Sequence, residues 1–105
     1  LSAKIEKLES LIQKYPFYQA YSLPVGTYPD QTSPVTMIND PAILFTSGKE
    51  DQSTVYNITK AIFDNLDELG QIHPQAKAIS LKTAKYTPIA LHPGAKKYFD
   101  EVSGK

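Results

Sequence analysis

The sequence predicts an α/β fold in which helices pack on a few strands. Apolar residues recur every three or four positions at the start of the chain and again across residues 51–69, which indicates two amphipathic helices. Between these helices lie short runs rich in aromatic and branched residues, which favour strands. With 105 residues the chain has room for one small domain, or for part of a larger one.

The first predicted element is an amphipathic helix at the start of the chain that ends before Pro16. Its apolar positions share one face, and they are Leu1, Ile5, Leu8, Leu11, Ile12 and Tyr15. Pro16 ends this helix, because the residue before a proline is pushed out of the helical region. Residues 18–23 are short and aromatic-rich, so we expect a strand that Pro24 ends.

The middle of the chain predicts a loop followed by further strands. Residues 24–34 form a stiff, turning loop, since prolines fix φ and Gly26 can adopt a positive φ. The apolar run at residues 42–46 lacks alternation, which is typical of a strand covered on both faces. Residues 35–38 are expected to pair beside that run.

The second half of the chain predicts a long helix, a short helical turn and a final helix. Asp51 or Ser53 can cap the long helix, and Gly70 stands where a left-handed residue would end it. The helical turn is expected around residues 80–85, and residues 89–91 should be briefly extended. The last helix should begin near Gly94.

Composition excludes several classes of function. Eleven lysines balance eleven acidic residues, so we expect no nucleic-acid partner. The chain has no arginine, so an arginine clamp for an anion would have to lie outside it. It also has no cysteine, which excludes disulfides, thiolate nucleophiles and Cys-ligated zinc.

The start of the chain has neither of the features expected at the beginning of an exported protein. It opens on a helical pattern without an initiator Met and without the apolar region of a signal peptide. There is no run of 18 or more apolar residues of the kind that spans a bilayer. We therefore interpret the chain as cut from a longer polypeptide.

The sequence predicts no catalytic residue, metal site or cofactor. His73 and His92 each precede a proline but lack the spacing of a metal-binding pair, so local hydrogen bonding is the better interpretation. Asp64 and Glu68 lie one turn apart, away from the apolar stripe, which is typical of a solvated face. The chain contains no Gly-x-Ser-x-Gly motif and no glycine-rich phosphate loop.

One stretch is a candidate for ligand contact. A proline-stiffened turn holds backbone N–H groups at fixed angles, and it carries a hydroxyl and a phenol beside them. The candidate ligand-binding residues are Pro24, Gly26, Thr27 and Tyr28. An equally good interpretation is a rigid connecting loop in which Tyr28 packs on the neighbouring prolines.

In the order of its motifs the chain resembles the TRAP transporter-associated extracytoplasmic immunogenic (TAXI) solute receptors. The matching elements, in chain order, are Lys14-Tyr15-Pro16-Phe17-Tyr18, Pro24-x-Gly26-Thr27-Tyr28-Pro29, the apolar run at 42–46, the helix at 55–63, His73-Pro74, and His92-Pro93-Gly94-Ala95 with Tyr98 and Phe99. Their agreement in order and spacing extends over nearly the whole chain. Residues 49–53 depart from the Leu-Pro-Glu-Asp type of start that family members often have before the long helix, which alters its cap.

The resemblance implies the C-terminal portion of a type II periplasmic-binding-protein fold, an incomplete lobe. Residues 1–105 would be a single C-terminal segment, with 1–17 a helix of the second lobe, 18–29 the hinge crossover and 30–105 the completion of the first lobe. The missing N-terminal part of the same polypeptide would be a partner of this segment.

The resemblance also implies a function. Such a receptor is periplasmic and is exported by a signal peptide that this chain lacks. It binds a small anionic solute, an amino acid or a dicarboxylate, between its lobes and delivers it to the TRAP membrane permease subunits. His92, Pro93 and Gly94 would form a structural turn that anchors the last helix.

Two other classes of function stay open. One is a standalone structural or interaction domain, such as a surface antigen module without a transport role. The other is a fragment of an enzyme, which the lack of a catalytic set disfavours.

Overall fold

The computed structural model describes residues 2–104. The chain divides into two compact units, Leu1–Ile43 and Leu44–Lys105, each with its own packing. Among the described residues there are four α-helices, one 3-10 helix and a two-stranded antiparallel sheet. This mixture of helix and strand is compatible with the predicted α/β class.

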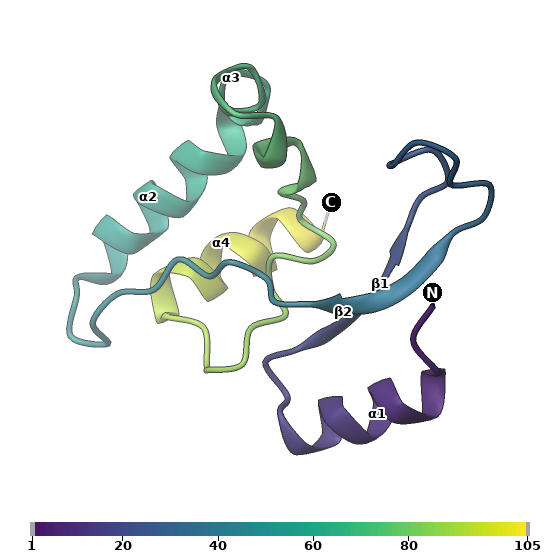
Figure 1. The fold of residues 1–105 in the computed structure, drawn as a ribbon. Helices are drawn as coiled ribbons and strands as arrows, with labels where there is room; N and C mark the ends of the chain where they lie inside the picture. The colour runs from purple at the N-terminus through teal and green to yellow at the C-terminus, as the bar shows by residue number, and fades with distance from the viewer. Residues whose placement is uncertain (1, 105) are drawn as a thin grey trace. The chain divides into compact units, whose positions relative to one another are not determined.

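The first unit consists of a helix and a β-hairpin (Figure 1). Helix α1 (Ile5–Lys14) is followed by strands β1 (Gln19–Leu23) and β2 (Val35–Asn39). The strands pair antiparallel in a register that runs from Gln19 opposite Asn39 to Leu23 opposite Val35. As predicted, α1 ends at the residue before Tyr15-Pro16.

Among the described residues of this unit, the buried side chain is Leu8 on α1. Leu8 is 7% exposed, on the apolar face that the sequence pattern defines. A two-stranded hairpin alone is only marginally stable, so this sheet depends on the contacts that α1 makes with both β1 and β2. On the opposite face of the sheet, the paired residues Tyr21 and Met37 stay 44% and 40% exposed.

Residues 42–46 do not form the predicted strand. They lie outside regular secondary structure, and Leu44 and Phe45 are 78% and 79% exposed. Strand β2 pairs with β1 instead of this run, while its Thr36 carbonyl accepts a hydrogen bond from the Ala3 N–H on the N-terminal segment at 2.9 Å. A strand needs a ladder partner, and none of the described strands pairs with this run.

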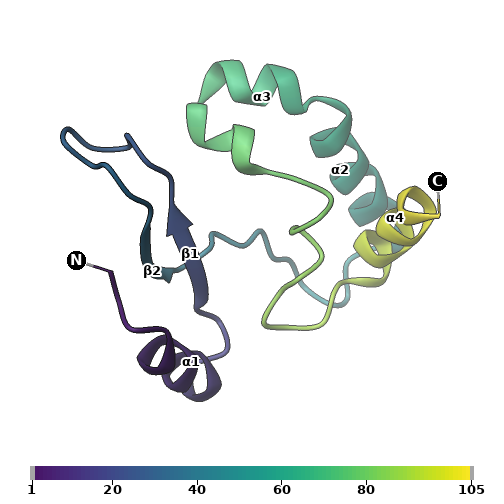
Figure 2. The same ribbon diagram turned by 90° about the vertical axis from the view of Figure 1, so that its right-hand side faces the viewer.

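The second unit is helical. It contains α2 (Gln52–Asp64), α3 (Leu66–Ile72), the 3-10 helix η1 (Pro74–Ala78) and α4 (Pro93–Ser103). Helix α4 packs along α2 (Figure 2). Their shared core contains Val55, Tyr98 and Phe99, each 6–7% exposed. The Phe63 ring stacks on Tyr98, with ring centroids 5.6 Å apart.

The long helix predicted over residues 51–69 is two helices. Asn65 separates them with φ −122° and ψ 29°, and its side-chain amide donates to the Ala61 carbonyl at 2.7 Å. Such a local side-chain bond competes with the helical ladder, and an asparagine favours this. The predicted end at Gly70 is also wrong, because α3 continues to Ile72. Gly70 is buried beside the Lys77 stem, where a Cβ would stand 3.0 Å from Cγ.

The remaining connections match the predictions in part. Residues 80–86 form the predicted turn, with the Ala84 N–H donating to the Ser80 carbonyl four residues earlier at 2.9 Å, as in one turn of a helix. Residues 89–91 lie outside the described strands. Helix α4 begins at Pro93, one residue before the predicted start.

Candidate functional site

The candidate ligand-binding residues lie together in the loop between β1 and β2. This connecting segment is residues 24–33, and we refer to it as the 24–33 loop. Two positive φ angles shape it, 78° at Gly26 and 63° at Asp30. The glycine pays no steric penalty there, and a short polar side chain such as Asp tolerates this conformation better than most. The sequence had indicated only the bend at Gly26.

The loop uses its own polar groups to hold its shape. The N–H of Gly26 donates to the Gln31 carbonyl at 3.2 Å, and that of Thr27 donates to the Pro24 carbonyl at 3.4 Å. The Thr27 hydroxyl donates to the same Pro24 carbonyl at 2.7 Å. The backbone donors that the sequence suggested for a ligand are therefore engaged inside the loop.

All four candidate residues are exposed, and Tyr28 is the one among them that offers an aromatic ring and a phenol to solvent. Its side chain is 66% exposed, which argues against its packing on the neighbouring prolines. The Tyr28 N–H donates to Oε1 of Gln31 at 3.3 Å, so the backbone that carries the phenol is fixed from inside the loop. An exposed phenol on such a fixed backbone can donate a hydrogen bond or stack against a planar group.

Gln31 is a residue of this site that the sequence reasoning missed. It is half-buried in a loop whose other residues are exposed, and its side-chain amide makes several of the loop's hydrogen bonds. Glutamine has no special preference for turns, unlike Gly, Pro, Asn, Asp and Ser, so the sequence carried no signal for this role.

The residues His92, Pro93 and Gly94 lie together at the start of α4. Nδ1 of His92 accepts a hydrogen bond from the Gly94 N–H at 3.1 Å, which caps the helix. Because Nδ1 accepts, the neutral ring carries its proton on Nε2, which donates to the Glu50 carbonyl at 3.2 Å. His73 caps η1 in the same way, accepting from the Gln75 N–H at 3.1 Å. Both His-Pro elements are therefore helix starts.

Gly94 also sets how α4 packs on α2, a role that the expected structural turn did not include. It lies within α4 and is buried against α2. A Cβ at this position would stand 2.7 Å from the Tyr56 nitrogen and 2.9 Å from the Val55 Cβ, and it would collide with the Gln52 carbonyl oxygen. The glycine permits the two helices to approach each other this closely.

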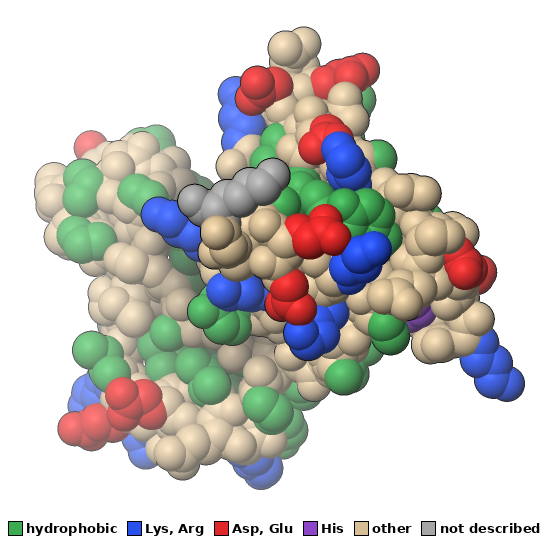
Figure 3. All heavy atoms as spheres, turned by 180° about the vertical axis from the view of Figure 1, so that it is seen from behind, with side chains coloured by type: hydrophobic (Ala, Val, Ile, Leu, Met, Phe, Trp, Pro, Cys, Tyr) green, Lys and Arg blue, Asp and Glu red, His purple; other side chains and the backbone are tan. Residues whose placement is uncertain are grey.

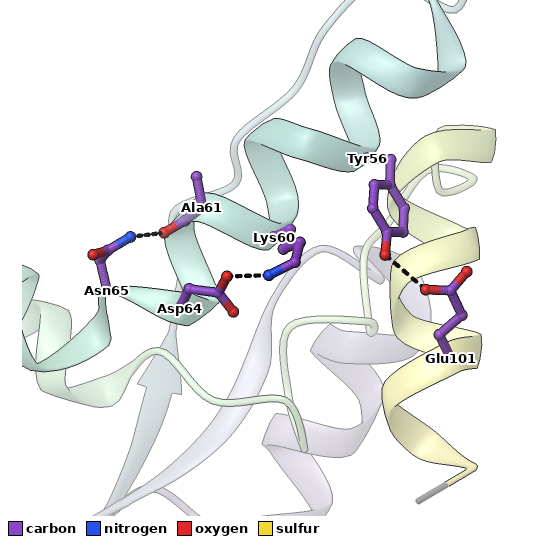
Figure 4. Close-up of polar contacts among 6 residues, drawn as sticks. All are labelled: Tyr56, Lys60, Ala61, Asp64, Asn65 and Glu101. Atoms are coloured by element: carbon purple, nitrogen blue, oxygen red, sulfur yellow. Dashed lines mark hydrogen bonds and ion pairs between the residues drawn. The ribbon is translucent and has the colours of Figure 1, made fainter.

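Exposed carboxylates of the second unit each have a different partner, and Figure 4 shows those of Asp64 and Glu101. Asp64 pairs with Lys60 one turn earlier on α2, and Asp100 pairs with Lys96 on α4. Glu101 accepts a hydrogen bond from the Tyr56 hydroxyl at 2.7 Å, which raises the pKa of Tyr56. These groups are exposed, as expected for a solvated face.

Away from these residues, the surface carries charges of both signs and a shallow hollow. On the face drawn in Figure 3, lysine and acidic side chains lie intermixed among hydrophobic ones. A shallow hollow of about 420 Å³ in the first unit is lined by Leu11, Tyr15, Phe17, Tyr18 and Ile38, and is separate from the 24–33 loop. Among residues 2–104 there is no cluster of three or more side chains able to hold a metal ion. None of the helices in that range is long and apolar enough to cross a bilayer.

A comparison with protein families identifies the group to which this chain is related. The model of the NMT1-like family matches residues 1–103. This family is part of the periplasmic solute-binding protein group, whose members are generally non-enzymatic and typically extracytoplasmic. With nearly its whole length matched, the chain belongs to the NMT1-like family of solute-binding proteins.

Proposed function

We propose that this chain is part of an extracytoplasmic receptor of the TAXI type, which binds a small carboxylate solute and delivers it to a TRAP membrane permease. The family match over residues 1–103 is the observation that supports the solute-binding role. The order of motifs from Lys14-Tyr15-Pro16 to His92-Pro93-Gly94 supports the finer assignment. The solute would be an amino acid or a dicarboxylate.

In this proposal the chain completes a two-lobed receptor of the type II binding fold. Residues 1–17 would belong to the second lobe, residues 18–29 would form the hinge crossover, and residues 30–105 would complete the first lobe. A solute that contacts both lobes stabilises the closed form, because only that form offers both sets of contacts. The closed form would then dock on the permease.

The 24–33 loop would contribute part of the pocket wall. Its internal hydrogen bonds fix the backbone of Pro24, Gly26 and Thr27 before a solute arrives, so little conformational entropy is lost on binding. Tyr28 would meet the solute carboxylate with its phenol, since its side chain is 66% exposed. The cation that completes carboxylate recognition would come from outside the loop, which contains neither Lys nor Arg.

A ligand screen of the full-length protein tests this proposal. We expect amino acids or dicarboxylates to raise the melting temperature in a concentration-dependent way, because a ligand that binds only the folded state stabilises it. Tyr28→Ala should weaken solute affinity by about 1–3 kcal/mol in isothermal titration calorimetry, the cost of an unpaired polar partner. Tyr86→Ala is a matched control, since Tyr86 is also 66% exposed but lies outside the loop. A full screen without any thermal shift would contradict the transport role.

A second candidate is an interaction domain, which the exposed Leu44 and Phe45 favour. In that case the full-length protein should bind none of the screened solutes. The double substitution Leu44→Ser and Phe45→Ser should leave solute affinity unchanged if the receptor proposal is correct.

A further inference from the structure

We propose that Gln31 positions Tyr28 for solute binding by holding the 24–33 loop closed from within. This inference rests on the proposed function, in which the loop forms part of the solute pocket. Gln31 would not touch the solute, so its effect on affinity would pass entirely through Tyr28.

The side-chain amide of Gln31 joins the two arms of the loop. Its Nε2 donates to the Pro24 carbonyl at 2.9 Å on the first arm and to the Ser33 carbonyl at 3.0 Å on the second. At the tip of the loop, its Oε1 accepts a hydrogen bond from the Tyr28 N–H at 3.3 Å. A single carboxamide thus serves these two acceptors and one donor, and a longer contact of 3.5 Å runs from Nε2 to the Leu23 carbonyl on the first arm.

The backbone of Gln31 strengthens the same arrangement. Its carbonyl accepts from the Gly26 N–H at 3.2 Å, and its N–H donates to the Tyr28 carbonyl at 3.2 Å. Tyr28 is therefore held to Gln31 by bonds at both its N–H and its carbonyl. These bonds fix the direction of the Tyr28 Cα–Cβ bond and so the region that its exposed phenol can reach.

Few side chains could replace this one. Asparagine is one methylene shorter and cannot span both arms. An ionised glutamate has the right length but no hydrogen to donate, and it would face the carbonyl oxygens of Pro24 and Ser33. Protonation of that glutamate restores one O–H donor, so Gln31→Glu is a substitution whose effect depends on pH.

The test measures amide hydrogen exchange by NMR in the full-length protein. For Gln31→Glu we expect the protection factors of the Gly26 and Tyr28 amides to fall about tenfold at pH 7 and to recover in part below about pH 4, where glutamate protonates. Gln31→Ala should lose the same protection at both pH values. Gln13→Glu, on the exposed face of α1, is the matched control and should leave both amides unchanged.

Calorimetry with L-glutamate and succinate tests the link to binding. We expect Gln31→Glu to weaken the affinity for the solute that binds by about tenfold at pH 7, about 1.4 kcal/mol. On the Tyr28→Ala background the same substitution should have little further effect, because both act through one side chain. Unchanged protection factors, or an equal loss of affinity on both backgrounds, would overturn the positioning role.

The two proposals can fail separately. If the wild-type protein binds neither probe nor any other screened anion, the receptor proposal fails. The protection factors of the Tyr28 amide still decide whether Gln31 positions that residue. If the solute binds and Gln31→Glu lowers protection without changing affinity, the receptor stands and the link from Gln31 to solute is overturned.

Discussion

The backbone carbonyl of Gln52 occupies the space that any side chain at Gly94 would need. The two residues come from different helices of the second unit, α2 and α4, and the contact joins backbone to backbone. Main-chain atoms cannot swing aside as a flexible side chain can. This contact therefore sets how closely the two helices approach.

Gly94→Ala should destabilise the protein by about 1–3 kcal/mol, the usual cost of overpacking a close contact. Chemical unfolding followed by circular dichroism measures this change. Gly104→Ala is the control at the other end of α4, because a Cβ there would be 3.6 Å from its nearest neighbour. Equal stability of the two variants would show that the helices can separate without cost.

His92→Ala should cost about 0.5–2 kcal/mol, because it removes the cap of α4. His92→Asn should recover most of this loss, since asparagine is a good N-cap residue. It cannot reproduce the contact with the Glu50 carbonyl, so recovery will be incomplete. The free energy of unfolding of the three proteins is the measurement, and an unstable Asn variant would argue against the capping role.

Asp51 should make stability depend on pH in the acid range. Hydrogen bonds from the Ser53 hydroxyl and the Thr54 N–H lower the pKa of Asp51 below its usual 3.8. A carboxyl with a depressed pKa contributes stability above its unfolded pKa and loses it as the pH falls through the folded one. We therefore expect stability to decline as the pH falls below about 4.

Asp51→Asn tests this assignment, since it keeps a capping oxygen but cannot titrate. Urea unfolding between about pH 5 and pH 2 should show a shallower decline for this variant than for the wild type. Parallel declines would assign the acid sensitivity to other carboxylates.

Phe99→Ala should destabilise the second unit by about 3–5 kcal/mol, because it empties a buried ring position packed against Phe63. Phe45→Ala is the matched control, as this ring is 79% exposed. Its effect on the free energy of unfolding should stay within about 0.5 kcal/mol. A large loss in the control would show that Phe45 is covered in the full-length protein.

Local patterns predicted those elements that depend on their own residues. The α1 apolar stripe, the Pro16 stop and the Asp51 cap are local signals, and the structure has all three. The run at residues 42–46 failed because a strand needs a partner that its own residues cannot supply. The break at Asn65 was missed because the apolar stripe continues across it.

The candidate site was predictable to a similar degree. Prolines and Gly26 indicated a stiff turn, and the chain does turn there. The residue that closes the turn, Gln31, was invisible because its role depends on three groups brought together only by the folded loop. The reason for glycine at position 94 was equally hidden, since its neighbours are about forty residues away in sequence.

The pairing of α2 with α4 also bears on how this unit is made. Tyr56 and its partner Glu101 are 45 positions apart. At roughly 5–20 residues per second, translation delivers the second helix several seconds after the first. Until α4 has been made, the aromatic side chains of α2 have no partner helix to pack against, so this unit cannot complete its core before that point.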